Sequence, residues 1–142
     1  IQYAMIFHKV ILLLMSINFY AQGRKNFVRK CGVAPKYKEG YILSQNYPDE
    51  TPKNTLCNYV IEIPTPGLLA YQVQELNMTG TNDCRDEGVT IVAGGQVTRY
   101  ICSDAYNRSI YNTTLHRLVV VFKSSNRRYR NGLKIHYFTY KK

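Results

Sequence analysis

The 142-residue sequence contains no tryptophan and few acidic residues, with nine Asp and Glu against nineteen Lys and Arg. The resulting formal charge of +10 bears on partners and solubility, and not on the fold. Internal repeats and low-complexity tracts are also missing, as is a long 3.6-residue apolar period. The chain is 45% hydrophobic and 13% aromatic, which excludes a disordered, collagen-like or coiled-coil protein and indicates one globular domain.

Catalytic signatures are absent as well. The sequence has neither a G-x-S-x-G nucleophile motif nor an H-E-x-x-H metalloprotease motif. His116 and His136 lie in segments that look like strands, where an edge or surface histidine is expected more often than a base. Asp83, Asp86 and Glu87 are explained by loop chemistry beside a cysteine. We therefore expect no enzymatic activity.

The cysteines do not form a zinc-binding pattern, because no C-x-x-C pair is present. Their even number indicates two disulfides formed in an oxidising compartment. Their spacing alone allows three connectivities. Sequential pairing would close loops of about 27 and 19 residues, each worth roughly 3 kcal/mol in the chain-entropy model. The four cysteines are Cys31, Cys57, Cys84 and Cys102.

A short apolar stretch near the start indicates a secretory signal peptide. Residues 6–20 are mostly apolar, and Ala21-Gln-Gly23 resembles a cleavage site. Because a bilayer span needs about 20 apolar residues, a transmembrane helix is the weaker interpretation. We assign residues 1–23 to upstream residues and a signal peptide starting at Met5, and residues 24–30 to a loose basic segment. The folded domain is expected over residues 31–140, in a secreted, extracellular protein without nucleic-acid partners.

Three N-x-[ST] triplets agree with secretion. They begin at Asn77, Asn107 and Asn112, and each asparagine can carry a glycan if it is exposed. Asn107 and Asn112 are close enough to compete for one glycan.

The mature chain is expected to be all-β. Residues 59–63 are rich in β-branched and aromatic side chains and are stopped by Pro64-Thr-Pro-Gly67. Several short strands separated by turn residues are typical of an antiparallel β-sandwich. The expected strands cover residues 59–63, 69–74, 89–92, 97–101, 118–122 and 133–140.

Five motifs in register with the four cysteines resemble a CUB domain, from Cys31 to Tyr137. Cys31-Gly32 opens the match, and Gly40–Pro48 is close to the family's G-x-I-x-S-P-N-Y-P, with Gln45 in place of proline. Cys57-Asn-Tyr59, Phe122–Ser125 and Gly132–Tyr137 resemble the second cysteine with its aromatic residue, F-x-S-D and G-F-x-A-x-Y. The resemblance implies a jelly-roll-like antiparallel sandwich with the pairings Cys31–Cys57 and Cys84–Cys102.

The resemblance also raises the question of calcium, which many CUB domains bind at one end. The family's three acidic ligand positions fall here on Thr79, Glu87 and Ser125, so one carboxylate remains. Calcium needs six to eight oxygen ligands and binds more tightly as carboxylates are added. We expect no cofactor and a degenerate calcium site, with a weak site rearranged around Asp83 and Asp86 as the alternative.

The same region has gained positive charge. Arg127, Arg128, Tyr129 and Arg130 follow one another in the loop before the last expected strand, and we predict them as binding residues. Their charge suits an acidic polymer such as heparan sulfate, or an anionic membrane surface. The expected partner is an extracellular protein or an anionic glycan such as heparan sulfate. The alternative is that they are solvated charges that keep the protein soluble.

Together these features favour a secreted, non-catalytic, single-CUB binding protein. Small proteins of this kind resemble components of venom, saliva or seminal secretions. The alternative is a regulatory module related to the CUB regions of extracellular proteases, docking to a protease or its substrate. No protease sequence follows Tyr140, so we expect the stand-alone form.

Overall fold

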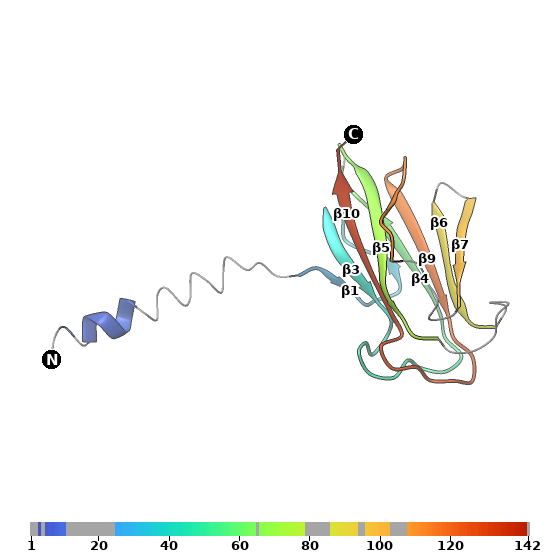
Figure 1. Cartoon of the computed structure of the whole chain (residues 1–142), viewed down its shortest axis with the longest axis horizontal. Coiled ribbons are helices and arrows are strands. Elements are labelled where there is room, and N and C mark those ends of the chain that lie inside the picture. Colours follow the sequence, from blue (N-terminus) through green and yellow to red (C-terminus); the bar gives the residue numbers. More distant parts are fainter. Residues whose placement is uncertain are drawn as a thin grey trace.

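The computed structural model describes residues 3, 5–10, 25–64, 66–78, 86–93, 96–102 and 108–141. Residues 5–10 are helical, and no helix in the described ranges is long and apolar enough to cross a membrane. The described strands form two five-stranded sheets that face each other as a sandwich (Figure 1). Most of the expected signal peptide lies outside the described residues.

The first sheet has the order β1-β3-β10-β5-β8, and the second has the order β2-β4-β9-β6-β7. The strands of the first sheet are β1 (Phe27–Val28), β3 (Glu39–Leu43), β10 (Leu133–Tyr140), β5 (Leu68–Leu76) and β8 (Tyr111–Asn112). Those of the second are β2 (Gly32–Val33), β4 (Leu56–Glu62), β9 (Arg117–Lys123), β6 (Gly88–Ala93) and β7 (Gln96–Ile101).

The sheets are mixed, which corrects the expectation of a wholly antiparallel sandwich. β1 pairs with β3 in parallel, and β2 pairs with β4 in parallel. From β1 to β6 the chain alternates between the two sheets, so these partners are not joined by hairpins that would force them antiparallel. The sandwich also starts before the expected boundary at Cys31, because Phe27–Val28 within the basic segment forms β1 and Val28 is buried.

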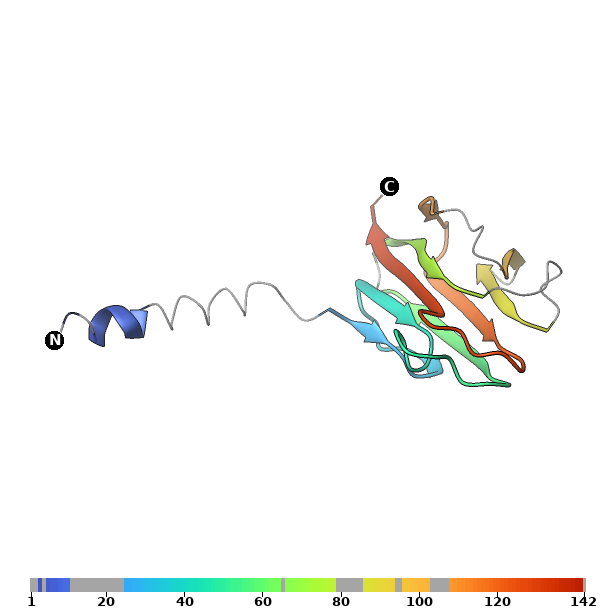
Figure 2. The same cartoon turned by 60° about the horizontal axis from the view of Figure 1, so that its bottom comes forward.

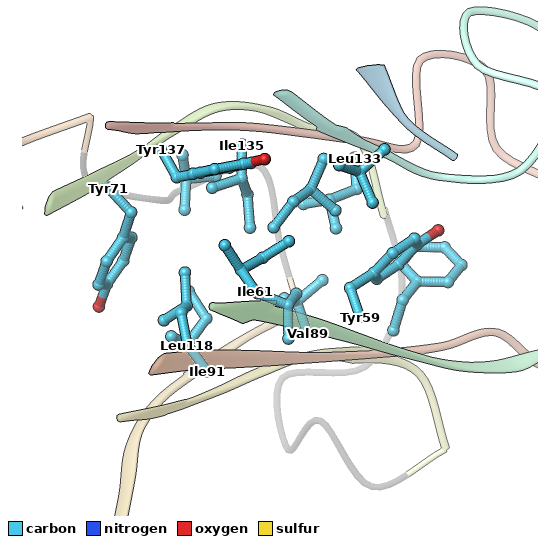
Figure 3. Packing of buried hydrophobic residues seen from close by; sticks show 14 of the residues in the cluster. Tyr59, Ile61, Tyr71, Val89, Ile91, Leu118, Leu133, Ile135 and Tyr137 are labelled. Atoms are coloured by element: carbon cyan, nitrogen blue, oxygen red, sulfur yellow. The ribbon is translucent and has the colours of Figure 1, made fainter. Parts of the chain in front are cut away.

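Alternation along the strands puts one apolar face of each sheet into the core. Ile61 and Leu118 of the second sheet point toward Ile135 and Tyr137 of the first, and Tyr59 lies on the side of Leu133 (Figure 3). Two fully buried tyrosines, Tyr59 and Tyr137, supply aromatic volume in a core without tryptophan. Tyr59 donates to the carbonyl of Leu43 at 2.9 Å, while burial raises the pKa of both phenols to about 12.

One of the two expected disulfides is described. Cys31 and Cys57 are bonded, with their Cα atoms 5.3 Å apart, and link the chain before β2 to β4. This is the pairing that the CUB resemblance implied. Cys84 lies outside the described residues, so the pairing Cys84–Cys102 stays a prediction, and no described cysteine is free.

Candidate functional site

One end of the sandwich gathers the loops in which the sequence placed its candidate binding residues. Residues 44–55 join β3 to β4, and residues 124–132 join β9 to β10; both lie at the lower end of Figure 1. We call residues 124–132 the arginine loop. Asp86 and Glu87, which precede β6, belong to the same end because Glu87 contacts the arginine loop directly.

Glu87 is the centre of this end. Its side chain is 6% exposed, and three donors of the arginine loop surround its carboxylate. Ser125 donates its hydroxyl to Oε1 at 2.5 Å and its backbone N–H to the same oxygen at 3.4 Å. The Tyr129 hydroxyl donates to Oε2. A buried carboxylate is stable only when it is paired or hydrogen-bonded, and here both oxygens accept hydrogen bonds.

These contacts shift both pKa values. Burial alone would raise the pKa of Glu87, but the hydrogen bonds from Ser125 and Tyr129 and the charge of Arg127 lower it below its ordinary value. Burial, helped by the hydrogen bond and negative charge of Glu87, raises the pKa of Tyr129 to about 12. Glu87 is therefore an ionised acceptor and Tyr129 a neutral donor near neutral pH.

Backbone hydrogen bonds hold the rest of the arginine loop in place. Thr51 and Tyr129 bond reciprocally, with Thr51 N–H donating to the Tyr129 carbonyl at 2.9 Å and Tyr129 N–H to the Thr51 hydroxyl at 3.1 Å. Asn77 donates its side-chain amide to the carbonyl of Arg130 at 2.7 Å. Asn131 adopts φ 53° and donates to the carbonyl of Pro48. The loop is thus fixed to two neighbouring segments.

Gly132 ends this loop at a place where no side chain fits. A Cβ atom there would lie 2.4 Å from the Thr51 methyl and 2.8 Å from the Ser44 hydroxyl. The Ser44 hydroxyl accepts the N–H of Leu133 at 2.9 Å, so it cannot move away without losing that bond. Close packing at Gly132 therefore sets how the arginine loop enters β10.

The four predicted binding residues divide into two groups. Arg127, Arg128 and Arg130 are exposed, as a binding role requires. Tyr129 is 5% exposed and belongs to the core cluster, so the structure does not present it to a partner. Sequence adjacency could not reveal this, because the residues that draw Tyr129 inward, Glu87 and Thr51, are 42 and 78 positions away.

An open depression of about 440 Å³ lies beside the arginine loop. Leu56 on its wall is 66% exposed, and Lys123 and Asp86 are exposed too. The lining residues are Asn54, Thr55, Leu56, Asp86, Lys123, Ser124, Ser125 and Asn126. The polar walls and the wide opening suit a protein side chain better than an enclosed small ligand.

The calcium positions can be tested in part. Thr79 and Asp83 lie outside the described residues, whereas Glu87 and Ser125 are bonded to each other. A calcium ion would need the Glu87 oxygens that now accept from hydroxyl groups. No group of three or more His, Cys, Asp or Glu that could hold a metal occurs in the described ranges. Of the three family positions, the described part of the chain thus places one carboxylate, Glu87, and one hydroxyl, Ser125, in contact with each other.

Other predicted positions are spread over the fold. Asn77 is half-buried and engaged with Arg130, Asn112 is exposed on β8, and Asn107 lies outside the described residues. His116 is exposed just before β9. His136 lies on β10 with Nε2 2.7 Å from Oε1 of Glu39. His116 thus adjoins the second sheet, whereas His136 is part of the first.

Comparison with known proteins gives a consistent match. The CUB domain family model matches residues 31–137, the span over which the sequence resembles that family. The human protein named signal peptide, CUB and EGF-like domain-containing protein 2 is 31% identical over 115 residues, which is 79% of this chain and 12% of the relative. Human cubilin is 38% identical over 82 residues, 54% of this chain and 2% of cubilin. The chain thus spans a small part of these relatives.

Solved structures agree with the fold. The CUB2 domain of MASP-1 bound to Ca2+ superposes with a TM-score of 0.66 at 21% identity, covering 77% of this chain and 98% of that domain. The full extracellular region of zebrafish Gpr126/Adgrg6 superposes with a TM-score of 0.69 at 20% identity, covering 79% of this chain and 15% of that region.

Proposed function

The chain belongs to the CUB domain family, and from this premise we propose that it is a secreted, non-catalytic module that binds an acidic extracellular protein through its arginine loop. CUB domains are protein-binding modules, and the relatives are extracellular CUB-containing proteins. The observation that carries the proposal is the presence of three exposed arginines on one hydrogen-bonded loop.

A loop that is fixed before binding loses little conformational freedom when a partner docks, so more of its contact energy appears as affinity. Arginine is enriched at protein interfaces and pairs bidentately with carboxylates. The neighbouring depression, with exposed Leu56 on its wall, adds an apolar contact beside the charges. An acidic protein surface with one protruding side chain fits both features.

We further propose that this end needs no calcium. In the Ca2+-bound CUB2 domain of MASP-1 the fold is similar, but here the Glu87 carboxylate is occupied by Ser125 and Tyr129. The hydrogen bonds of Glu87 hold the arginine loop in place, as a bound calcium ion would in a domain that has the ion at this position.

The proposal is tested by capture from extracellular fluid on immobilised wild-type protein and on the triple variant Arg127→Gln, Arg128→Gln, Arg130→Gln. The matched control is Lys36→Gln, Lys38→Gln, Lys141→Gln, which removes the same charge from exposed positions elsewhere. We expect an acidic protein to be retained by wild type and control and lost from the loop variant. Retention by all three proteins would refute a binding role for the loop.

Secretion has its own test, through the glycan at Asn112. This asparagine is exposed, whereas the side-chain amide of Asn77 already donates to Arg130. In a eukaryotic secretory host, mass analysis before and after glycosidase treatment should find a glycan on Asn112. An unmodified Asn112 in medium-derived protein would contradict this assignment.

The protease-associated alternative stays a prediction. A protease partner that is captured by the wild type and still binds the loop variant would favour it over the acidic-partner proposal.

A further inference from the structure

The outward face of the first sheet carries a second basic surface, which comes from strand register and not from sequence adjacency. Phe27 on β1 lies opposite Tyr41 on β3, Tyr41 lies opposite His136 on β10, and His136 lies opposite Gln72 on β5. These strands lie side by side in both views of the fold (Figures 1 and 2). Directly opposite residues share one face of a sheet.

The residues one position further along these strands show that Phe27, Tyr41, His136 and Gln72 lie on the outward face of the sheet. Val28 pairs with Ile42, Ile42 with Ile135, and Ile135 with Val73. All four are at most 5% exposed and belong to the core. Because side chains alternate along a strand, the row that begins at Phe27 points away from the core.

The outward row is a connected set of rings. The centroid of Phe27 is 5.9 Å from that of Tyr41, Tyr41 stacks on His136 at 4.6 Å with 16° between the planes, and His136 is 5.1 Å from Phe138. We call Phe27, Tyr41, His136 and Phe138 the aromatic strip. Phe27 is 48% exposed and the other rings are partly exposed, so the strip is open to a partner.

Three cations surround the aromatic strip. Lys25 and Lys134 place their ammonium groups 5.6 Å and 5.3 Å from the Tyr41 ring centroid, and the Arg29 guanidinium lies 5.7 Å from that of Phe27. Two acidic side chains, Glu39 and Glu75, lie near these cations, and each already contacts another side chain. Glu39 contacts His136, and Glu75 accepts from the Tyr47 hydroxyl at 2.5 Å. The excess of positive charge favours an anionic ligand.

The chemistry of the exposed side chains narrows the class of ligand. Around the rings stand Gln72 and Gln74 of β5 and the three cations. Leu68, opposite Tyr140 at the far end of β10, is a half-exposed aliphatic side chain of this face, so apolar aliphatic contact is sparse beside the rings. The centre of a protein interface is usually more apolar than this. Ring faces, amides and cations instead match the C–H faces, hydroxyl groups and charged groups of an acidic sugar chain.

We propose that the aromatic strip, with Lys25, Arg29 and Lys134, binds a sulfated polysaccharide. The proposal is independent of the arginine loop, which meets its own partner at the end of the sandwich. The sequence alone suggested the arginine loop as the binding site for an anionic glycan. The proposal places that binding site on the outward face of the first sheet instead.

The test compares two variants of equal charge on immobilised heparin. The strip variant is Lys25→Gln, Arg29→Gln, Lys134→Gln, and the loop variant is Arg127→Gln, Arg128→Gln, Arg130→Gln. Since a basic residue near an anionic surface contributes about fivefold in affinity, the strip variant should bind heparin about a hundredfold more weakly than wild type. The loop variant should keep nearly wild-type affinity. An equal loss in both variants, or a loss in the loop variant alone, would overturn the proposal.

A charge-neutral variant separates sugar recognition from simple charge attraction. Phe27→Ala changes no charge and, because Phe27 is half exposed, should leave thermal unfolding nearly unchanged. We expect it to weaken binding of heparin-derived oligosaccharides roughly fivefold, as for the loss of one stacking contact, and to leave binding of polyglutamate unchanged. Equal affinity of the wild type for polyglutamate and heparin, with no effect of Phe27→Ala, would show a general anion-binding surface and refute the sugar assignment.

Discussion

The arginine loop and the aromatic strip each present three cations, but the fold positions them in different ways. The arginine loop is held by a buried carboxylate and by backbone bonds to Thr51, Asn77 and Pro48. The aromatic strip is held by the register of three strands, β1, β3 and β10, and its side chains lie on a sheet whose other face packs in the core. Changes beneath the loop should therefore reduce stability, whereas changes in the strip should affect binding alone.

The largest effect is expected at the carboxylate below the loop. Glu87→Leu leaves the hydroxyls of Ser125 and Tyr129 without their acceptor, so the free energy of unfolding should fall by about 3 kcal/mol. The matched change beside the aromatic strip is Glu39→Leu. The Glu39 side chain is 62% exposed, so its loss should lower the free energy of unfolding by less than about 0.5 kcal/mol. Urea denaturation of both variants measures the two values. Similar losses at the two sites would abolish the distinction between the regions.

A smaller effect is expected when one hydroxyl is removed. Tyr129→Phe keeps the buried ring but deletes the donor to Glu87, and a hydrogen bond to a charged group is worth about 2 kcal/mol. Tyr41→Phe keeps the ring that stacks on His136 and should change stability by less than about 0.5 kcal/mol. Thermal unfolding of the pair checks this, and a stable Tyr129→Phe protein would mean that ring burial alone holds the loop.

The pH dependence of stability gives a finer test. The folded protein holds the pKa of Glu87 below its ordinary value, so the stabilising contribution of the carboxylate is complete above the ordinary pKa of about 4.3. It is lost as the pH falls through the lower folded value. The stability advantage of the wild type over Glu87→Gln should therefore shrink in acid, as followed by denaturation from neutral pH downward. A constant difference would contradict an ionised, hydrogen-bonded Glu87.

The two regions also differ in how far they could be predicted. Arg127, Arg128 and Arg130 are adjacent in the sequence, so a basic cluster was visible without a structure. Lys25 and Lys134 are far apart and meet over one ring only because β1, β3 and β10 are neighbours. Register between distant strands has no local signal, and the strip could not be found from the sequence.

The strands of the fold could likewise be predicted only where the local sequence carries a pattern. Each of the six expected strands overlaps an observed one, because four or more residues of alternating or β-rich sequence give a recognisable strand pattern. The two-residue strands β1, β2 and β8 carry none, and the parallel pairings of β1 and β2 were missed with them. The burial of Tyr129 had no local signal either, since its hydrogen-bond acceptor, Glu87, is 42 positions away in the sequence.

The central claim is that hydrogen bonds from Ser125 and Tyr129, and not a metal ion, hold the loop end of this CUB domain. The most direct test is thermal unfolding of the refolded, disulfide-intact chain in millimolar calcium and in EDTA. We predict melting temperatures that agree within about 1 °C, since a domain of this size shifts by roughly 4–8 °C for each kcal/mol of ligand binding. A melting temperature several degrees higher in calcium would contradict the claim, most clearly if Glu87→Gln abolished the increase.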